Sequence, residues 1–243
     1  MSEMKRKRGR SATELALRKA ASASDSLVRV EDIQGVTPAA ASKALSRLAE
    51  QGKLKRVAKG VYHSLKKTPL GASKPSAAAM VRRTLKDKTR PTGASAANLL
   101  GLSTQVPARP QLVVFGSNLP ADAYGARVHL RRGARSHPLT ELEGALLEFL
   151  RDRGAYAQTG GEETLKRLGR LLKSELSESR LRELRDAAQD EPPRVRAVLG
   201  ALFEHTGLSK SLFEPLRKSL NPLSKFDFGL LRELPNALEW QAK

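Results

Sequence analysis

The stretch from Thr37 to His63, TPAAASKALSRLAEQGKLKRVAKGVYH, decides the fold of the N-terminal third of the chain. Thr37 offers a capping hydroxyl directly before Pro38, and proline suits the first position of a helix. Apolar side chains then recur at the spacing of one helix face, at Ala41, Ala44, Leu45 and Leu48. Gly52 stands where a helix C-cap is expected. The spacing predicts a helix over residues 38–50.

A basic β-hairpin is predicted directly after this helix. Residues 53–57 and 60–63 have the composition of two short strands, and Gly60 can supply the positive φ of the turn between them. Leu54 and Val57, however, do not share the strict period of two that a regular strand has.

The segments before this stretch complete a DNA-binding pattern. A helix over residues 11–24, a strand at 27–30 and a short helix at 31–33 are expected. With the helix and hairpin that follow, this order predicts a winged helix-turn-helix over residues 11–70. The alternative is an ordinary α/β subdomain with a basic surface. Small or hydrogen-bonding side chains on the outer helix face favour the winged helix, because a DNA major groove is only about 12 Å wide.

The outer helix face and the hairpin supply the predicted DNA contacts, and a basic arm at residues 1–10 would add sequence-independent affinity. Arg47 is the candidate for reading guanine, because its fork can bond O6 and N7 together. A phosphate contact or an ion pair with Glu50 are its alternative roles. The predicted set is Thr37, Ser42, Lys43, Ser46 and Arg47 from the helix, Lys55, Arg56 and Lys59 from the hairpin, and Lys5, Arg6, Lys7, Arg8 and Arg10 from the arm.

The distribution of charge also points to a polyanion partner. The 243-residue chain carries 44 Lys and Arg against 25 Asp and Glu, a formal net charge of +19. Residues 1–64 carry 14 basic and 6 acidic side chains, residues 65–138 carry 13 and 2, and residues 139–243 carry 17 of each. Because solubility needs a net charge of only about 2–8 on a small domain, the charge predicts a nucleic acid as partner, and the winged-helix pattern makes double-stranded DNA the expected one. An anionic membrane is disfavoured, since no basic segment is strongly apolar on its opposite face.

Residues 71–243 are expected to form a C-terminal domain with two parts. Residues 71–138 have the pattern of a small α+β unit whose basic face also lies along DNA, on flanking phosphates. Residues 139–243 are neutral and show the apolar stripes of successive helices. The predicted fold class is therefore α+β and mainly helical, with a winged helix-turn-helix, a small α+β unit and a C-terminal helical region in that order.

The chain offers no recognisable catalytic or ligand-binding motif. The absence of cysteine excludes zinc fingers, disulfide scaffolds and thiol nucleophiles. His63, His129, His137 and His205 share no metal-ligand spacing, and no zinc-protease, P-loop or dinucleotide-binding motif occurs. We therefore expect a non-enzyme with no catalytic residue, cofactor or metal; a divergent nuclease is the least favoured alternative.

Localisation is predicted from two further absences. No stretch approaches the ~20 apolar residues of a membrane span, and residues 1–10 lack the apolar core of a signal peptide. We expect a cytoplasmic, nucleoid-associated protein without membrane contact.

Two segments of the chain resemble the AbiEi-type antitoxins of type IV, abortive-infection toxin–antitoxin systems. The first comprises ALSRL at residues 44–48, GKLKRV at 52–57 and GVY at 60–62; the second, longer and more specific, is PTGASAANLLGLSTQVP at 91–107. The resemblance covers about residues 25–135.

The resemblance implies a non-catalytic protein with two tasks. Its winged helix would bind repeats in its own promoter as an autorepressor, and its C-terminal domain would counteract a nucleotidyltransferase-like toxin. We expect a monomer in solution or cooperative binding on DNA. The alternative is a nucleoid- or RNA-associated basic protein that binds DNA or RNA without sequence preference and has no toxin partner.

Overall fold

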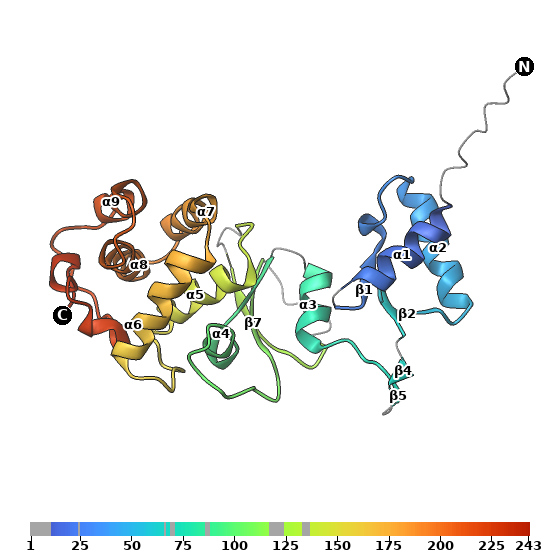
Figure 1. Cartoon of the computed structure of the whole chain (residues 1–243), viewed down its shortest axis with the longest axis horizontal. Helices are drawn as coiled ribbons and strands as arrows, with labels where there is room; N and C mark the ends of the chain where they lie inside the picture. Colours follow the sequence, from blue (N-terminus) through green and yellow to red (C-terminus); the bar gives the residue numbers. More distant parts are fainter. Residues whose placement is uncertain are drawn as a thin grey trace, which may run out of the picture. The chain divides into compact units, whose positions relative to one another are not determined.

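The computed structural model describes residues 11–23, 25–65, 67–68, 71–85, 88–116, 124–132 and 137–243. The chain divides into two compact units, an N-terminal unit from Met1 to Lys86 and a C-terminal unit from Asp87 to Lys243. Small sheets and nine α-helices are present among the described residues, so the predicted α+β class is confirmed (Figure 1).

The N-terminal unit combines a small sheet with two helices, α1 and α2, that lie side by side (Figure 1). Its elements are α1 (Ala12–Ser22), β1 (Leu27–Arg29), the 3-10 turn η1 (Val30–Asp32), α2 (Pro38–Glu50), β2 (Leu54–Ala58), β3 (Val61–Ser64), β4 (Lys67–Thr68), β5 (Gly71–Ala72) and α3 (Ala77–Leu85). β3 pairs antiparallel with both β1 and β2, and β4 pairs antiparallel with β5.

Local capping fixes the ends of α2 where the sequence predicts them. The Thr37 hydroxyl accepts a hydrogen bond from the backbone N–H of Ala40 at 3.3 Å, directly before Pro38 at the first helical position. At the other end, Gly52 adopts φ +70° and its N–H donates to Ala49, while the N–H of Lys53 donates to Leu48. This pair of bonds is the Schellman motif, which satisfies the last carbonyls of a helix.

The hairpin contains a bulge that explains the imperfect alternation of its sequence. Arg56 pairs with Tyr62 and Ala58 pairs with Val61, so Val57 is an extra residue in β2. An extra residue shifts the side-chain alternation by one position.

The apolar face of α2 packs with α1 and the sheet in the core of this unit. The core contains Ala16, Ala20, Ala23, Val28, Ile33, Ala41, Ala44, Leu45, Leu48, Leu54 and Tyr62.

The boundary between the two units lies later than the sequence suggests. The prediction ends the first domain at residue 70, whereas the structure includes α3 in the N-terminal unit. The Arg83 guanidinium on α3 donates to the Asp25 carboxylate at 2.8 and 3.2 Å and lies 3.4 Å from Asp32. These charge pairs link α3 to the segment around β1 across more than fifty residues. Sequence periodicity does not predict contacts between residues so far apart in the chain.

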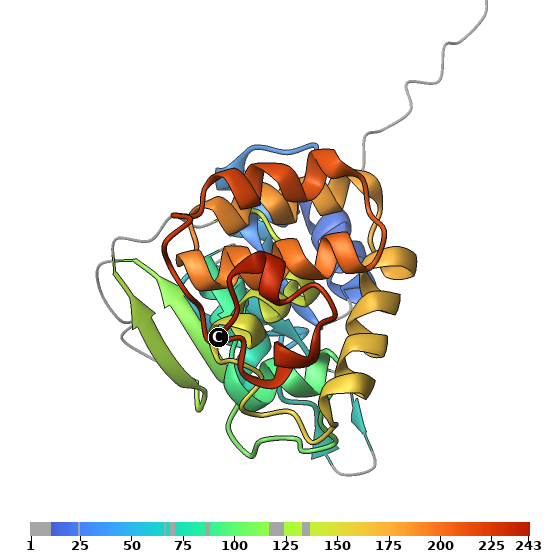
Figure 2. The same ribbon diagram turned by 90° about the vertical axis from the view of Figure 1, so that its left-hand side faces the viewer.

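The C-terminal unit combines a three-stranded sheet with a set of helices. Its elements are β6 (Thr89–Pro91), α4 (Gly93–Leu99), β7 (Gln111–Phe115), β8 (Arg127–Arg131), α5 (Glu141–Arg151), α6 (Gly161–Arg170), the π-helical turn η3 (Leu171–Glu175), α7 (Glu178–Gln189), α8 (Pro193–His205), α9 (Lys210–Lys218) and the 3-10 turns η4 (Gly229–Glu233) and η5 (Leu238–Trp240). β7 lies between β6, antiparallel to it, and β8, parallel to it. α8 and α9 lie side by side, as the orange and red helices of Figure 2 show.

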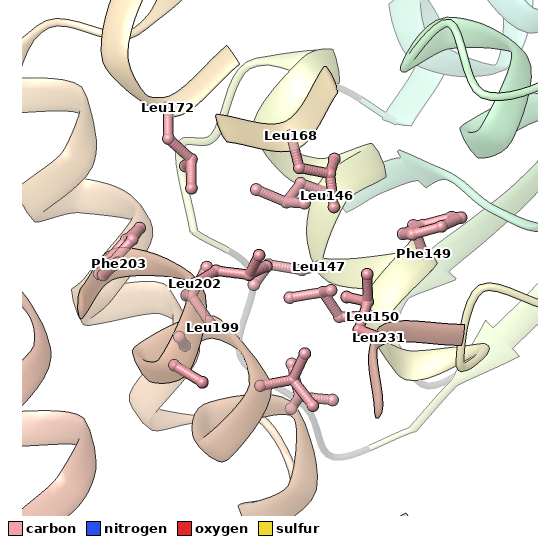
Figure 3. Close-up of a cluster of buried hydrophobic side chains, with 14 of the residues drawn as sticks. Leu146, Leu147, Phe149, Leu150, Leu168, Leu172, Leu199, Leu202, Phe203 and Leu231 are labelled. Atoms are coloured by element: carbon pink, nitrogen blue, oxygen red, sulfur yellow. The ribbon is translucent and has the colours of Figure 1, made fainter. Parts of the chain in front are cut away.

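The apolar stripes of these helices meet in one core. Leu146 and Leu147 of α5, Leu168 of α6 and Leu202 of α8 are completely buried, and the labelled side chains converge in Figure 3. Amphipathic periodicity alone therefore identifies the core-facing side of these helices.

The capping box predicted before α5 is present. The Thr140 hydroxyl accepts a hydrogen bond from the Glu143 N–H, and the Glu143 carboxylate accepts one from the Thr140 N–H.

The block at residues 91–107 is held by polar side chains of its own and by Gln111 of β7. Gly93 adopts φ +55°, a conformation that strains other residues, and a Cβ there would lie 2.0 Å from Oε1 of Gln111, so that the Gln111 side chain would have to move. The Ser95 hydroxyl accepts from the Gln111 N–H at 2.8 Å. Asn98 donates to the Ser103 carbonyl at 3.1 Å. These contacts give several of the block's polar residues a structural role in fixing α4 against β7.

Candidate nucleic-acid interface

α2 presents two faces of opposite character. Ala41, Ala44, Leu45 and Leu48 are buried, whereas Lys43, Arg47 and Glu50 are exposed and Ser42 is half-buried. Arg47 and Glu50, both in the described part of α2, do not form the ion pair considered from the sequence. Among the described residues, the Arg47 guanidinium therefore has no hydrogen-bonding or ion-pair partner.

The hairpin adds cations next to α2. Lys55 and Arg56 on β2 and Lys59 in the turn are exposed, and β2 packs beside α2. Lys53, in the connection between α2 and β2, is also exposed. Lys53 is not among the DNA contacts predicted from the sequence. Its position between the Gly52 cap and the first hairpin strand is the signal that could have identified it as a contact.

We call the exposed side of α2 together with this hairpin the basic surface. Its cations are Lys43, Arg47, Lys53, Lys55, Arg56 and Lys59. None of these six side chains forms an ion pair or a hydrogen bond with another described residue. Within the described residues 37–64 the one acid is Glu50, so the surface carries a clear excess of positive charge.

The other acids of the N-terminal unit are mainly paired elsewhere. Arg83 contacts both Asp25 and Asp32, and Arg29 lies 3.5 Å from Glu31. Burial raises the pKa of Asp25, but the hydrogen bonds from Arg83 and the Leu27 N–H outweigh burial and lower the pKa overall. The same bond raises the pKa of Arg83. Asp25, Glu31 and Asp32 are thus paired with Arg29 or Arg83 and leave the cations of the hairpin unneutralised.

Two of the predicted DNA-contacting hydroxyls have structural partners. Thr37 caps α2, as described above. The Ser46 and Tyr62 hydroxyl oxygens lie 3.1 Å apart, and Tyr62 is 3% exposed. Ser46 therefore joins α2 to β3. The arm residues Lys5, Arg6, Lys7, Arg8 and Arg10 lie outside the described residues.

Part of the positive charge in residues 65–138 is used inside the protein. Arg90 is 3% exposed and donates to Glu191 at 2.7 Å. Arg131 donates to both oxygens of Glu148, with 2.7 Å for the Nη2–Oε2 bond. These arginines neutralise carboxylates of residues 139–243. The net charge of zero in that region therefore does not mean that its acidic side chains are paired only with its own basic ones. The exposed cations without an ion pair in the described part of this segment of the C-terminal unit are Lys88, Arg109, Arg127 and Arg132.

The histidines lie in separate environments. His63 is buried, His129 and His205 are exposed, and His137 Nε2 lies 2.7 Å from Asp190. Within the residues that the structure describes, no group of three or more His, Asp or Glu side chains is placed to hold a metal ion. In the same part of the chain, no helix combines the length and the apolar character needed to cross a bilayer.

The chain is similar to a sequence family and to a solved structure. A sequence family described as a family of unknown function, DUF6088, matches residues 16–122, which is less than half of the chain. Among solved structures, the RV2827C protein from Mycobacterium tuberculosis is similar, with 18% sequence identity and a TM-score of 0.45 over 95% of this chain and 90% of that chain. No curated protein matches the chain.

Proposed function

We propose that the N-terminal unit is a winged helix-turn-helix that binds double-stranded DNA, with α2 as recognition helix and the β2–β3 hairpin as wing. The observation that carries this proposal is the set of six cations on the basic surface that have no ion pair or hydrogen bond with any residue the structure describes. Cations that are not paired within the protein can replace the counterions condensed on DNA, and counterion release dominates the affinity of such complexes.

The positions of these side chains suggest a division of roles. Lys43 and Arg47 project from α2 and are the side chains that can reach base edges in a major groove, with Ser42 beside them. Lys53, Lys55, Arg56 and Lys59 would contact phosphates or the minor groove, and the arm at residues 5–10 would add sequence-independent contacts. Because Ser46 and Thr37 have structural partners, we assign them to positioning α2 rather than to base recognition.

We further propose that the protein is a sequence-specific autorepressor and the antitoxin of a type IV toxin–antitoxin system. This extension rests on the resemblance of residues 44–62 and 91–107 to the AbiEi-type antitoxins. The C-terminal unit would counteract a nucleotidyltransferase-like toxin, and promoter binding would place the protein on the nucleoid. The rival is sequence-independent binding of DNA or RNA.

A gel-shift titration at about 150 mM salt distinguishes these two modes of binding. The probes are the DNA upstream of the protein's own start codon and a scrambled duplex of equal length. Specific complexes are typically about 10³-fold tighter than non-specific ones, so a gap of that size supports autorepression. Equal affinity for both duplexes would overturn autorepression at that site and leave only sequence-independent binding.

The antitoxin role needs a separate test. The neighbouring gene is expressed from an inducible promoter with and without this protein, and growth is recorded. Rescue by the wild type and by a variant that no longer binds DNA would assign neutralisation to the C-terminal unit. Growth arrest that the wild-type protein does not relieve would contradict the antitoxin role without affecting the DNA-binding proposal.

A further inference from the structure

The C-terminal unit contains a recess that the proposed function does not use. It has a volume of about 580 Å³ and lies between α6 with its continuation η3 on one side and the end of α8 with residues 233–235 on the other. Small-molecule sites commonly have volumes of about 300–1,000 Å³.

The floor of the recess is apolar. Leu165, Gly169 and Pro235 line it. The Thr206 hydroxyl donates to the Leu202 and Phe203 carbonyls at 2.8 and 3.0 Å, which leaves its methyl group toward the recess. A Cβ at Gly169 would lie 3.5 Å from that methyl carbon. Glycine at position 169 therefore keeps the space between α6 and α8 open without being required by its backbone.

Cations line one wall of the recess at helical spacing. Lys166, Arg170 and Lys173 follow one another at four and three residues, so they lie on one side of the helix. Lys166 pairs with Glu162 at 2.6 Å. Arg170 and Lys173 form no ion pair or hydrogen bond among the described residues, and His205 faces the recess from the opposite wall. Glu175, which forms an ion pair with Arg167, also interacts electrostatically with Arg170. Arg170 and Lys173 still leave this end of the recess with a net positive charge.

The remaining acid lies near the other end of α6. A Cβ at Gly161 would lie 2.6 Å from Oε2 of Glu233, which places this carboxylate at the first residue of the helix. With a rise of 1.5 Å per residue, Arg170 is about 13 Å further along the helix axis. Glu233 therefore does not neutralise Arg170 and Lys173. One end of the recess is acidic and the other, which we call the basic end, is positively charged.

The backbone changes its geometry where this basic end lies. η3 is a π-helical turn that continues α6, and it carries Lys173 and Ser174 into the wall of the recess.

From these features we propose that the recess binds an amphipathic organic anion. A phosphate, sulfonate or carboxylate group would contact Arg170 and Lys173. The apolar or planar body would lie on Leu165, Gly169, Pro235 and the Thr206 methyl group. The recess lies within the C-terminal unit, and anion binding there does not depend on DNA binding by the N-terminal unit. The gel shift and the probe-binding experiment can therefore fail separately.

The test uses the full-length protein and the fluorescent probe anilinonaphthalene sulfonate, which combines an aromatic body with an anionic group. Saturable binding to one site is expected. Gly169→Leu should abolish it by filling the recess, whereas Gly169→Ala, which adds one methyl group in ordinary contact, should retain it. Circular dichroism and thermal unfolding of both variants verify that they fold.

Charge is tested with a second matched pair. Arg170→Gln combined with Lys173→Gln should weaken probe binding about tenfold or more, as expected when charged hydrogen-bonding partners are lost. Lys210→Gln combined with Lys218→Gln removes the same charge from exposed positions on α9 and should leave binding unchanged. Octyl phosphate should displace the probe, and octylammonium should not.

Several outcomes would overturn the proposal. These are an absence of saturable binding, undiminished binding to the folded Gly169→Leu variant, and equal effects of the two double substitutions. If an acidic helical peptide displaced the probe while octyl phosphate did not, the small-molecule site would be replaced by a docking site for an acidic protein segment.

Discussion

Arg90 and Glu191, separated by 101 positions in the sequence, form an ion pair of 2.7 Å in which each side chain is only 4% exposed. Around them, Glu148 lies 3.7 Å from Arg90 and accepts both bonds from Arg131, while Arg151 donates to Glu191. The Arg90 guanidinium also lies 4.6 Å from the centre of the Phe115 ring. The network joins β6 and β8 to α5 and to the connection before α8.

Arg90→Met should destabilise the protein by about 3–5 kcal/mol, because it leaves Glu191 and Glu148 buried with less compensating charge. Urea unfolding at pH 7 measures the change. Combining it with Glu191→Leu should recover part of the loss, since the uncompensated carboxylate is then removed. Arg132→Ala, at an exposed position without an ion pair, is the control. Equal stabilities for Arg90→Met and the control would contradict this account.

Removing the hairpin cations should weaken binding to every duplex alike. In the variant with Lys55, Arg56 and Lys59 each changed to Ala, the slope of log K against log salt should become shallower by about 3, near one per phosphate contact. A matched variant with Arg109, Arg127 and Arg132 changed to Ala removes the same charge from the C-terminal unit. A change in slope of less than about one would confine the phosphate contacts to the N-terminal unit. Equal changes would show that residues 71–138 also lie along DNA.

Arg47→Ala should relax sequence preference. If its guanidinium reads a guanine, the variant loses about 1–3 kcal/mol of discrimination against the wrong base pair. Affinities for the upstream duplex and for single-base variants of it give this number. Lys74→Ala, at an exposed position in the same unit, provides the control. A uniform loss on all duplexes would make Arg47 a phosphate contact.

The Ser46–Tyr62 pair should stabilise the junction of α2 and β3. Tyr62→Phe or Ser46→Ala is expected to cost about 0.5–1.5 kcal/mol, the net value of one hydrogen bond. The double variant should cost less than the sum of the two, because both single changes remove the same bond. Ser42→Ala, for which the structure gives no hydrogen bond, should change stability by less than about 0.5 kcal/mol. Fully additive losses would argue against the bond.

Acid should destabilise the fold through Glu143. Burial raises the pKa of this carboxyl, but hydrogen bonds from Arg180 and Thr140 outweigh burial and lower the pKa below its ordinary value of 4.5. A lowered folded-state pKa means that the unfolded chain takes up the proton first. The stabilisation is therefore complete above about pH 4.5 and is lost as pH falls through the folded-state pKa.

Unfolding free energies from pH 3 to 7 test this dependence. Glu143→Gln should be less stable at pH 7 and should lose less stability on acidification than the wild type. Some dependence should remain, because the pKa values of Asp25 and Glu204 are lowered too. Glu239→Gln, at an exposed position, should follow the wild-type curve. An unchanged acid profile in Glu143→Gln would disprove this assignment.

The elements that the sequence predicts well depend on neighbouring residues. The bounds of α2 agree at both ends, because Thr37, Pro38 and Gly52 act within a few residues of themselves. The two hairpin strands lie one residue later than predicted. The bulge at Val57 accounts for the irregular alternation, but the pattern alone could not reveal which residue of β2 is extra.

The sequence predicts the roles of individual charged side chains less well than it predicts the helix ends. Arg47 and Arg90 are both arginines in basic segments. Arg47 is exposed and has no partner in the described part of the chain, whereas Arg90 is buried in an ion pair. Composition assigns both to a surface that contacts DNA. Arg83 likewise counts toward the basic segment, whereas the structure pairs it with Asp25.

By itself, the sequence determined the helix caps, the apolar faces and the excess of positive charge, because each depends on residue type and short-range spacing. The tertiary structure decided which cations remain unpaired, that α3 belongs to the N-terminal unit, and that α6, α8 and residues 233–235 enclose a recess. Burial and ion pairing depend on segments brought together from distant parts of the chain, and local patterns carry no information about those distances.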